Sequence, residues 1–177
     1  MNFKKLSVLF CSLLALTSVM AVSAAETETV SETEAASEEE STASGADEET
    51  EYPITIQHAY GETVIESKPE RIATVGWENQ DTPLALGIAP VGVSAANYGM
   101  VTENNLHPWT DEAFQELGVD APNVFDDVDG LDFEAISDCD PDVILASYSG
   151  LTQEDYDTLS QIAPVIPYKE NAWQTTW

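Results

Sequence analysis

The sequence predicts an α/β fold, in which a β-hairpin precedes a Rossmann-like parallel sheet. Two observations support this prediction. Short apolar runs alternate with segments of helical periodicity from residue 72 to residue 166, and strands that alternate with helices join through crossovers into a parallel sheet. One of these runs, residues 143–146 (VILA), is continuously apolar, which is typical of a strand buried on both faces.

The predicted hairpin begins the folded part of the chain. Ile54 and Ile56 alternate with polar residues up to His58, Gly61 supplies a turn residue, and residues 63–65 run back. A proline shortly afterwards ends this pairing. The parallel strands are then predicted at residues 72–75, 90–93, 123–125, 143–146 and 165–166.

Helices are predicted between these strands. The first covers residues 81–86, with Asp81 or Thr82 as its N-cap and a glycine directly after it. The second covers residues 110–117, and the preceding residues 107–109 are expected to form a loop. The last two helices are expected to begin at the capping residues Asp132 and Thr152, the latter with an acidic residue three positions on, as in a capping box.

Residues 1–25 have the pattern of a secretory signal peptide. Two lysines near the start precede the apolar residues 6–22, and small residues lead to a cleavage point after Ala24 or Ala25. The alternative, a transmembrane anchor, would need a longer apolar run. A bulky phenylalanine directly before Cys11 argues against lipid attachment there. We therefore expect an extracytoplasmic protein of the cell envelope.

Residues 26–51 are predicted to be a disordered acidic linker. They hold 11 acidic residues, many Ser, Thr and Ala, and no aromatic residue. Such a composition cannot bury enough apolar surface to offset the entropy of the chain. The alternative is a binding tail, although its composition specifies no partner. The folded part is therefore residues 52–177, which is the length of one ordinary domain.

The folded part is strongly acidic. Residues 52–177 carry 22 acidic side chains and three basic ones, a formal net charge of −19. Such a surface repels nucleic acid and anionic membranes, so no nucleic-acid partner is expected. Cys139 is the lone cysteine of residues 52–177. It is therefore expected to be a packing or surface residue without an internal disulfide.

Polar and aromatic residues follow three of the predicted strands, in the segments 76–80, 94–99 and 147–150. The carboxyl ends of parallel strands meet at one edge of a sheet, and ligands bind outside that edge. We therefore expect the three segments to share a rim and to form a binding site.

The expected rim presents Trp77, Tyr98 and Tyr148 to solvent, the last of them flanked by Ser147 and Ser149. Aromatic rings with polar tips offer a flat apolar area together with a hydrogen bond. This combination suits a bulky amphipathic small molecule. The alternative is that one or more of these rings pack beneath the loops.

Metal and catalytic motifs find less support. The segment 125–136 (FDDVDGLDFEAI) is similar to a calcium-binding loop, but apolar residues occupy its first and last ligand positions. His58 and His107 lack metal-ligand spacing to each other or to Cys139. No nucleophile-elbow or phosphate-loop motif is present. Neither a metal cofactor nor an enzyme is therefore expected.

The sequence also resembles a known family. Residues 68–94 (KPERIATVGWENQDTPLALGIAPVGVS) resemble the opening of iron–siderophore substrate-binding proteins of ABC importers, and residues 131–168 are similar to the second block of that family. Residues 171–177 (NAWQTTW) are similar to the lead into its interlobe helix. The resemblance implies the fold of class III periplasmic binding proteins, two α/β lobes joined by a long helix. Residues 52–177 would be the N-terminal lobe, with the second lobe absent from this chain.

The resemblance also implies ligand-binding residues at the strand ends and before the connecting helix. These are Trp77, Asn79, Tyr98, Ser147, Tyr148, Ser149 and Trp173. Glu134 matches a surface glutamate that docks on a basic pocket of the membrane permease. The alternative role of Glu134 is to stabilise the positive start of its helix.

The implied ligand is a ferric siderophore, with its iron already chelated and no further cofactor. The implied partners are the ABC permease subunits. Catecholate binders of the family gather Arg and Lys, so the three basic residues here favour a hydroxamate siderophore. A corrinoid or haem ligand is the alternative within the family, with Tyr148 available as an axial ligand. An enzyme that uses Ser147 and a surface interaction module with the acidic linker are the alternatives outside it.

Overall fold

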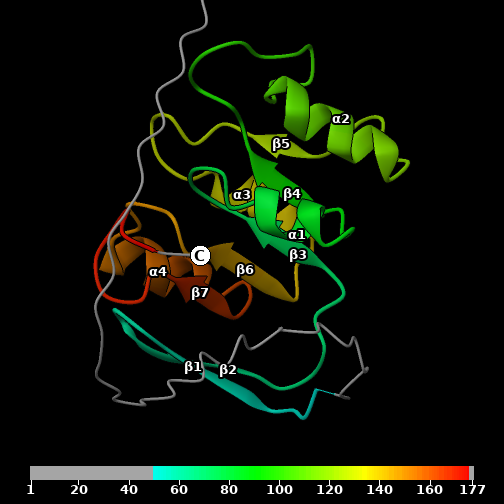
Figure 1. The fold of residues 1–177 in the computed structure, drawn as a ribbon. Coiled ribbons are helices and arrows are strands. Elements are labelled where there is room, and N and C mark those ends of the chain that lie inside the picture. The colour runs from blue at the N-terminus through cyan, green and yellow to red at the C-terminus, as the bar shows by residue number, and fades with distance from the viewer. Residues whose placement is uncertain (1–49, 176–177) are drawn as a thin grey trace, which may run out of the picture. The chain divides into compact units, whose positions relative to one another are not determined.

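The computed structural model describes residues 50–175. The signal peptide predicted for residues 1–25 and nearly all of the acidic linker predicted for residues 26–51 lie outside the described residues and stay predictions. The described part contains a two-stranded hairpin and a five-stranded sheet with four helices (Figure 1). Among those helices, none combines the length and the apolar character that crossing a lipid bilayer requires.

The five-stranded sheet has the strand order β5-β4-β3-β6-β7. Its strands are β3 (Ile72–Thr74), β4 (Gly92–Ser94), β5 (Val124–Phe125), β6 (Val143–Ala146) and β7 (Val165–Pro167). Every neighbouring pair is parallel, which confirms the predicted α/β class. The chain builds the sheet from β3 to β5 and then returns to β6 on the other side of β3. With right-handed crossovers, this reversal places the first two helices and the last two helices on opposite faces.

The four helices are α1 (Asp81–Ala85), α2 (Pro108–Glu116), α3 (Phe133–Asp138) and α4 (Gln153–Leu159). Two predicted caps are confirmed. The Asp132 carboxylate accepts a hydrogen bond from the backbone N–H of Ala135 at 2.9 Å. The Thr152 hydroxyl accepts from the N–H of Asp155, and the Asp155 carboxylate accepts from the N–H of Thr152. These bonds satisfy N–H groups that the first turn of a helix leaves without partners.

Two helix starts differ from the prediction. Gln80 occupies the N-cap of α1 and makes no side-chain cap bond, so the predicted cap at Asp81 or Thr82 is wrong. Helix α2 begins at Pro108 rather than residue 110, so only His107 of the expected loop 107–109 stays outside the helix. The physical reason for the earlier start of α2 is Pro108. Its ring fixes a helical φ at the first position of the helix and keeps the preceding residue, His107, extended.

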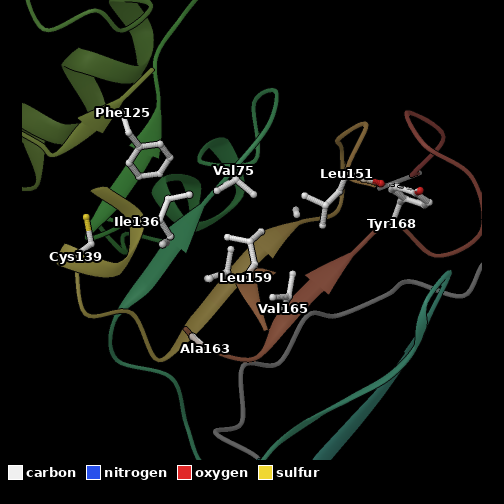
Figure 2. Close-up of a cluster of buried hydrophobic side chains, with 12 residues drawn as sticks. Val75, Phe125, Ile136, Cys139, Leu151, Leu159, Ala163, Val165 and Tyr168 are labelled. Atoms are coloured by element: carbon white, nitrogen blue, oxygen red, sulfur yellow. Dashed lines mark hydrogen bonds between the residues drawn. The ribbon is translucent and has the colours of Figure 1, made fainter. Parts of the chain in front are cut away.

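Two clusters of buried side chains hold the sheet to its helices. The larger cluster joins β3, β5, β6 and β7 to α3 and α4, and Figure 2 shows Val75, Ile136, Leu159 and Val165 pointing into it. The smaller cluster joins β4 to α1 and α2; it consists of Leu84, Val93, Leu106 and Phe114. Cys139 is buried in the larger cluster as a free thiol, and its burial raises its pKa. This residue therefore packs, which is one of the two roles predicted for it.

The hairpin lies against strand β7. Strands β1 (Ile54–His58) and β2 (Gly61–Ile65) pair antiparallel, as predicted. The Ala59 N–H donates to the Tyr168 carbonyl at 3.1 Å, and the Thr63 hydroxyl donates to the Val165 carbonyl at 2.7 Å. The Tyr60 hydroxyl bonds to the Leu151 carbonyl and to the Tyr168 hydroxyl. The hairpin is thus fixed to the sheet by polar contacts on several elements.

The buried His58 makes this attachment sensitive to acid. Its Nδ1 accepts from the Tyr60 N–H at 3.2 Å, so its Nε2 carries the proton and donates to the Thr63 hydroxyl at 2.9 Å. A second proton, on Nδ1, would face the N–H of Tyr60, so that two hydrogen-bond donors would oppose each other. Burial lowers the pKa of His58. The neutral ring therefore stabilises the fold above the ordinary histidine pKa of about 6.5, and this contribution is lost as pH falls below that value.

We expect the free energy of unfolding to fall more between pH 7 and pH 5 in the wild-type chain than in His58→Gln. Glutamine does not titrate, while its amide can still donate to Thr63. Urea unfolding at several pH values between these limits would measure both slopes. Equal slopes in the two proteins would show that His58 does not contribute to the acid sensitivity.

Candidate functional site

The candidate site lies where the strand order reverses. Strands β3 and β6 are neighbours, but the chain continues from β3 toward β4 and from β6 toward β7. Such a reversal opens a crevice outside the carboxyl ends of the two strands. Trp77 follows β3 and Tyr148 follows β6, and the Trp77 N–H donates to the Tyr148 carbonyl at 3.2 Å. The topology therefore brings these two loops into direct contact.

Aromatic side chains form a continuous row of ring contacts along this rim. The members of this aromatic row are, in order, Trp109, His107, Tyr98, Trp77, Tyr148 and Trp173. The Trp77 ring centroid lies 4.7 Å from that of Tyr98 and 6.3 Å from that of Tyr148, with the latter pair only 15° from parallel. Tyr148 meets Trp173 edge-on at 5.5 Å. The structure thus brings together the rings that the sequence predicts at this edge, while their contact with a ligand stays a prediction.

Three rings of the row are partly exposed. Trp77 and Tyr98 are each 39% exposed and Trp173 is 48% exposed. These values leave ring faces accessible, in contrast to the alternative in which the rings are sealed beneath the loops. An aromatic surface of this kind can contact a bulky guest at low cost in side-chain entropy.

Glu78 fixes the orientation of Tyr98. The Tyr98 hydroxyl donates to the Glu78 carboxylate at 2.7 Å, and this bond raises the pKa of Tyr98 to about 12. The phenol therefore stays protonated at neutral pH. Glu78 has a φ of 55°, and Trp173 has a φ of 60°. Residues other than glycine rarely adopt this left-handed conformation, which tends to occur where a site needs a special side-chain direction.

Two hollows open beside the row, and both are lined by Trp77 and Trp173. The first has a volume of about 400 Å³, and its lining includes Gly76, Ser94, Ser149, Asp127 and Asp155. The second has a volume of about 650 Å³. Its lining also includes Glu78, Thr82, Ser147 and Tyr148. In the part of the chain that the structure describes, neither hollow has a lysine or arginine in its lining.

Two of the predicted site residues are buried instead of exposed. Ser149 is 3% exposed, and its hydroxyl donates to the Ala146 carbonyl at 2.7 Å and accepts from the Leu151 N–H at 3.3 Å. Asn79 is 4% exposed and bonds to backbone groups of both central loops. The expectation that the segment 147–149 is wholly held out to solvent is therefore wrong for Ser149. The reason is that the backbone leaving β6 needs hydrogen-bond partners, which Ser149 supplies.

Trp173 reaches the row because Gly150 leaves space for its ring. A Cβ atom on Gly150 would lie 2.9 Å from Cζ2 and 3.1 Å from Nε1 of Trp173. The Trp173 N–H also donates to the Ser149 carbonyl at 3.3 Å. The glycine therefore determines how closely the indole approaches the end of β6.

Gly150→Ala is expected to displace the Trp173 ring from Tyr148 while changing the free energy of unfolding by less than about 1 kcal/mol, because the indole is half-exposed and free to move. Nuclear Overhauser effects between the two rings would report the displacement. Gly76→Ala is the contrasting variant: its Cβ would lie 2.7 Å from Ser149 Cβ, and its φ is 80°. That variant should be clearly destabilised. Unchanged ring contacts in Gly150→Ala would contradict the spacing role.

The described residues offer little support for metal or covalent chemistry. Within residues 50–175, no group of three His, Cys, Asp or Glu side chains is placed to hold a metal ion. The Ser147 hydroxyl donates to the Asn79 amide oxygen at 3.0 Å. An amide oxygen does not act as a base at neutral pH, so this contact does not activate Ser147 as a nucleophile.

Glu134 lies in the first turn of α3 and is exposed. In a parallel α/β sheet the helix that follows a strand starts at the carboxyl edge, so Glu134 lies on the same side of the sheet as the rim. This position is compatible with both predicted roles, permease docking and stabilisation of the helix start.

Sequence reasoning missed two members of the aromatic row. His107 is buried, stacks on Trp109 at 4.4 Å and meets Tyr98 edge-on at 4.5 Å. The sequence feature that could have indicated this arrangement is Pro108. A proline at the first position of a helix fixes its own φ and keeps the backbone of the residue before it extended. Because residues 107–109 are expected to form a loop, the sequence does not predict the stacking of His107 on Trp109.

An aromatic rim at the switch point of a parallel α/β sheet is an arrangement that suits the binding of a small molecule. The family described as periplasmic binding protein matches residues 72–177, which is more than half of the chain. The chain belongs to the periplasmic binding protein family. Its resemblance to iron–siderophore substrate-binding proteins of ABC importers is confirmed.

Three relatives define the similarity more closely. PiaA of Streptococcus pneumoniae TIGR4, solved in complex with ferrichrome, is 59% identical with a TM-score of 0.66 over 70% of this chain and 41% of its own. Staphylococcus aureus SirA, complexed with staphyloferrin B, is 29% identical with a TM-score of 0.53 over 65% of this chain and 36% of its own. The ABC transporter substrate-binding lipoprotein YhfQ of Bacillus subtilis (strain 168) is 28% identical over 127 residues, 71% of this chain and 36% of the relative. The chain therefore spans 36% to 41% of the length of these relatives.

Proposed function

We propose that this chain supplies the N-terminal ligand-binding lobe of an extracytoplasmic substrate-binding protein, which passes a ferric siderophore to an ABC importer. The observation that carries the proposal is the aromatic row, which lies at the switch point of the sheet and contributes Trp77 and Trp173 to the lining of both hollows. Aromatic faces with a few polar groups bind a chelated metal complex without any protein ligand to the iron. The similarity to PiaA, solved with ferrichrome, supports the same class of ligand.

The charge distribution favours a hydroxamate siderophore. Each hydroxamate carries one negative charge, so three of them balance Fe³⁺, whereas doubly deprotonated catecholates leave the complex anionic. Glu78, Asp127 and Asp155 line the two hollows, and these carboxylates repel an anionic guest.

Arg71 strengthens this argument because it is engaged elsewhere. It stands directly before β3, at the opposite end of the strand from Trp77. Its guanidinium donates to the Asp140 carbonyl at 2.6 Å and to the Cys139 carbonyl. Arg71 is thus committed to the far edge of the sheet, where it cannot neutralise an anionic ligand at the rim.

Fluorescence titration of the full 177-residue chain with ferrichrome, a ferric tris-catecholate and haemin would test the proposal. We expect quenching of the tryptophans of the row to saturate with ferrichrome at a lower concentration than with the other two. Free tryptophan titrated with each compound corrects for light absorbed by the iron complexes. Tighter binding of the catecholate would refute the hydroxamate assignment, and tighter binding of haemin would favour the haem alternative.

Permease docking is the second part of the proposal, and Glu134 is its candidate contact. We expect Glu134→Arg to weaken capture of the chain by its detergent-solubilised ABC permease several-fold, without a change in ferrichrome affinity. Glu154→Arg is the matched control, because Glu154 also lies exposed in the first turn of a helix, α4. Equal losses in both variants would indicate a general charge effect, and no loss in either would leave Glu134 with only its helix-stabilising role.

A further inference from the structure

The buried amide of Asn79 lies between the two loops that carry Trp77 and Tyr148. Its Nδ2 donates to the Val75 carbonyl at 2.7 Å and to the Tyr148 carbonyl at 2.9 Å, with a longer bond to the Trp77 carbonyl at 3.4 Å. Its Oδ1 accepts from the Tyr148 N–H at 2.9 Å and from the Ser147 hydroxyl at 3.0 Å. One side chain therefore bonds to Val75, which directly follows β3, and to Ser147 and Tyr148, which directly follow β6.

The four shorter bonds already use the full capacity of the amide. An asparagine side chain has two N–H donors and one carbonyl oxygen with two lone pairs, and each of these has a partner here. Asn79 is also 4% exposed and absent from the lining of both hollows. It has neither a free group nor an open path for direct contact with a guest.

The bonds of Asn79 fix the backbone from which the two central rings project. Asn79 follows Trp77 by two residues, and two of its four shorter side-chain bonds go to Tyr148 itself. The Trp77 N–H donates to the same Tyr148 carbonyl that Asn79 bonds. A shift of one loop against the other would therefore change both the separation of 6.3 Å and the angle of 15° between the two rings.

We propose that Asn79 is a positioning residue, which sets the spacing of Trp77 and Tyr148 and through it the affinity for the ligand. This inference rests on the proposed function for the ligand, but the ring geometry can be measured without any ligand. It replaces the direct ligand contact expected for Asn79 with an action through its two neighbours in the aromatic row.

Asn79→Asp is the most informative variant because it keeps the shape and removes the donors. At neutral pH the carboxylate would face the carbonyl oxygens of Val75 and Tyr148, and the repulsion should separate the loops. At low pH the protonated carboxyl regains one donor, so the geometry should partly recover. We expect at least a ten-fold loss of ferrichrome affinity relative to wild type at pH 7.5, and a smaller loss at pH 5.

The ring geometry is read from nuclear Overhauser effects between Trp77 and Tyr148 in the ligand-free chain. Gln80→Ala is the matched control, since Gln80 is the next residue, is similarly buried, and bonds through its side chain only to Asp81. We expect the control to keep both the ring contacts and the affinity. Ser147→Ala removes one of these bonds and should change the ring contacts less. Because Ser147 also lines the second hollow, its ring contacts in the ligand-free chain, and not its affinity, keep the test decisive if Asn79→Asp fails to fold.

Each outcome decides between distinct explanations. Altered ring contacts together with lost affinity and recovery at low pH would support positioning. Lost affinity with unchanged ring contacts would overturn it in favour of direct ligand contact, and wild-type affinity in Asn79→Asp would also overturn it. If the wild-type chain binds no ferrichrome, the proposed function fails, while unchanged ring contacts in Asn79→Asp would separately refute positioning.

Discussion

Trp77→Ala is expected to lower the affinity for ferrichrome by about 10- to 100-fold, because aromatic rings that the bound partner covers at the centre of an interface contribute most of its binding energy. Trp77 lies in the middle of the aromatic row, contacts the rings on both sides of it, and lines both hollows. Its loss would remove the ring face that Tyr98 and Tyr148 flank. Isothermal titration calorimetry on the full chain would measure the change.

Trp109→Ala serves as the control for this substitution. Trp109 is 52% exposed at the far end of the same row, and it lines neither hollow. Its affinity should stay within about two-fold of wild type, the behaviour of a residue outside the central contact. Equal losses in the two variants would mean that the site extends along the whole row, and no loss in Trp77→Ala would place the ligand elsewhere.

Phe114→Ala is expected to have the largest effect on stability, about 3–5 kcal/mol of the free energy of unfolding. Phe114, on α2, is 0% exposed and packs with Leu84, Val93 and Leu106 in the cluster that joins α1 and α2 to β4. Alanine would leave a cavity in the smaller of the two clusters, which has only four buried members among the described residues. Leu106 directly precedes His107, so the cavity also weakens the support of the aromatic row.

Urea unfolding would measure this loss, with Gln115→Ala as the control from the adjacent, exposed position of the same helix. The control should change the free energy of unfolding by no more than about 0.5 kcal/mol, as is usual for exposed helix positions. A loss below about 1 kcal/mol in Phe114→Ala would show that the smaller cluster collapses around the alanine.

The sequence was most informative where a pattern extends over several residues. The continuous apolar run of β6, the alternation of the hairpin, and the caps at Asp132 and Thr152 each have a mechanism that acts within a few positions of the chain. The parallel sheet follows from the order of these elements, and the common edge of Trp77 and Tyr148 follows from the sheet. Those steps do not depend on the packing of any particular side chain.

The parts that sequence could not predict depend on contacts between distant segments. Nothing near Asn79 in the chain shows that its amide meets Tyr148, which lies 69 residues away. The sequence predicts an exposed serine at position 149, whereas the Ser149 hydroxyl donates to the carbonyl of Ala146, the last residue of β6. A polar residue after a strand can face solvent or satisfy buried backbone groups, and only the tertiary structure decides between these outcomes.

The hairpin has a consequence for the solubility of the chain. Outermost strands of a sheet expose unpaired backbone groups, which can recruit other chains into aggregates. On one side of the sheet, Tyr60 and Thr63 hold the hairpin over β7; on the other side, β5 consists of only two residues. Both borders of the sheet thus offer little template for intermolecular pairing, which protects a protein of this topology while it is concentrated or crowded.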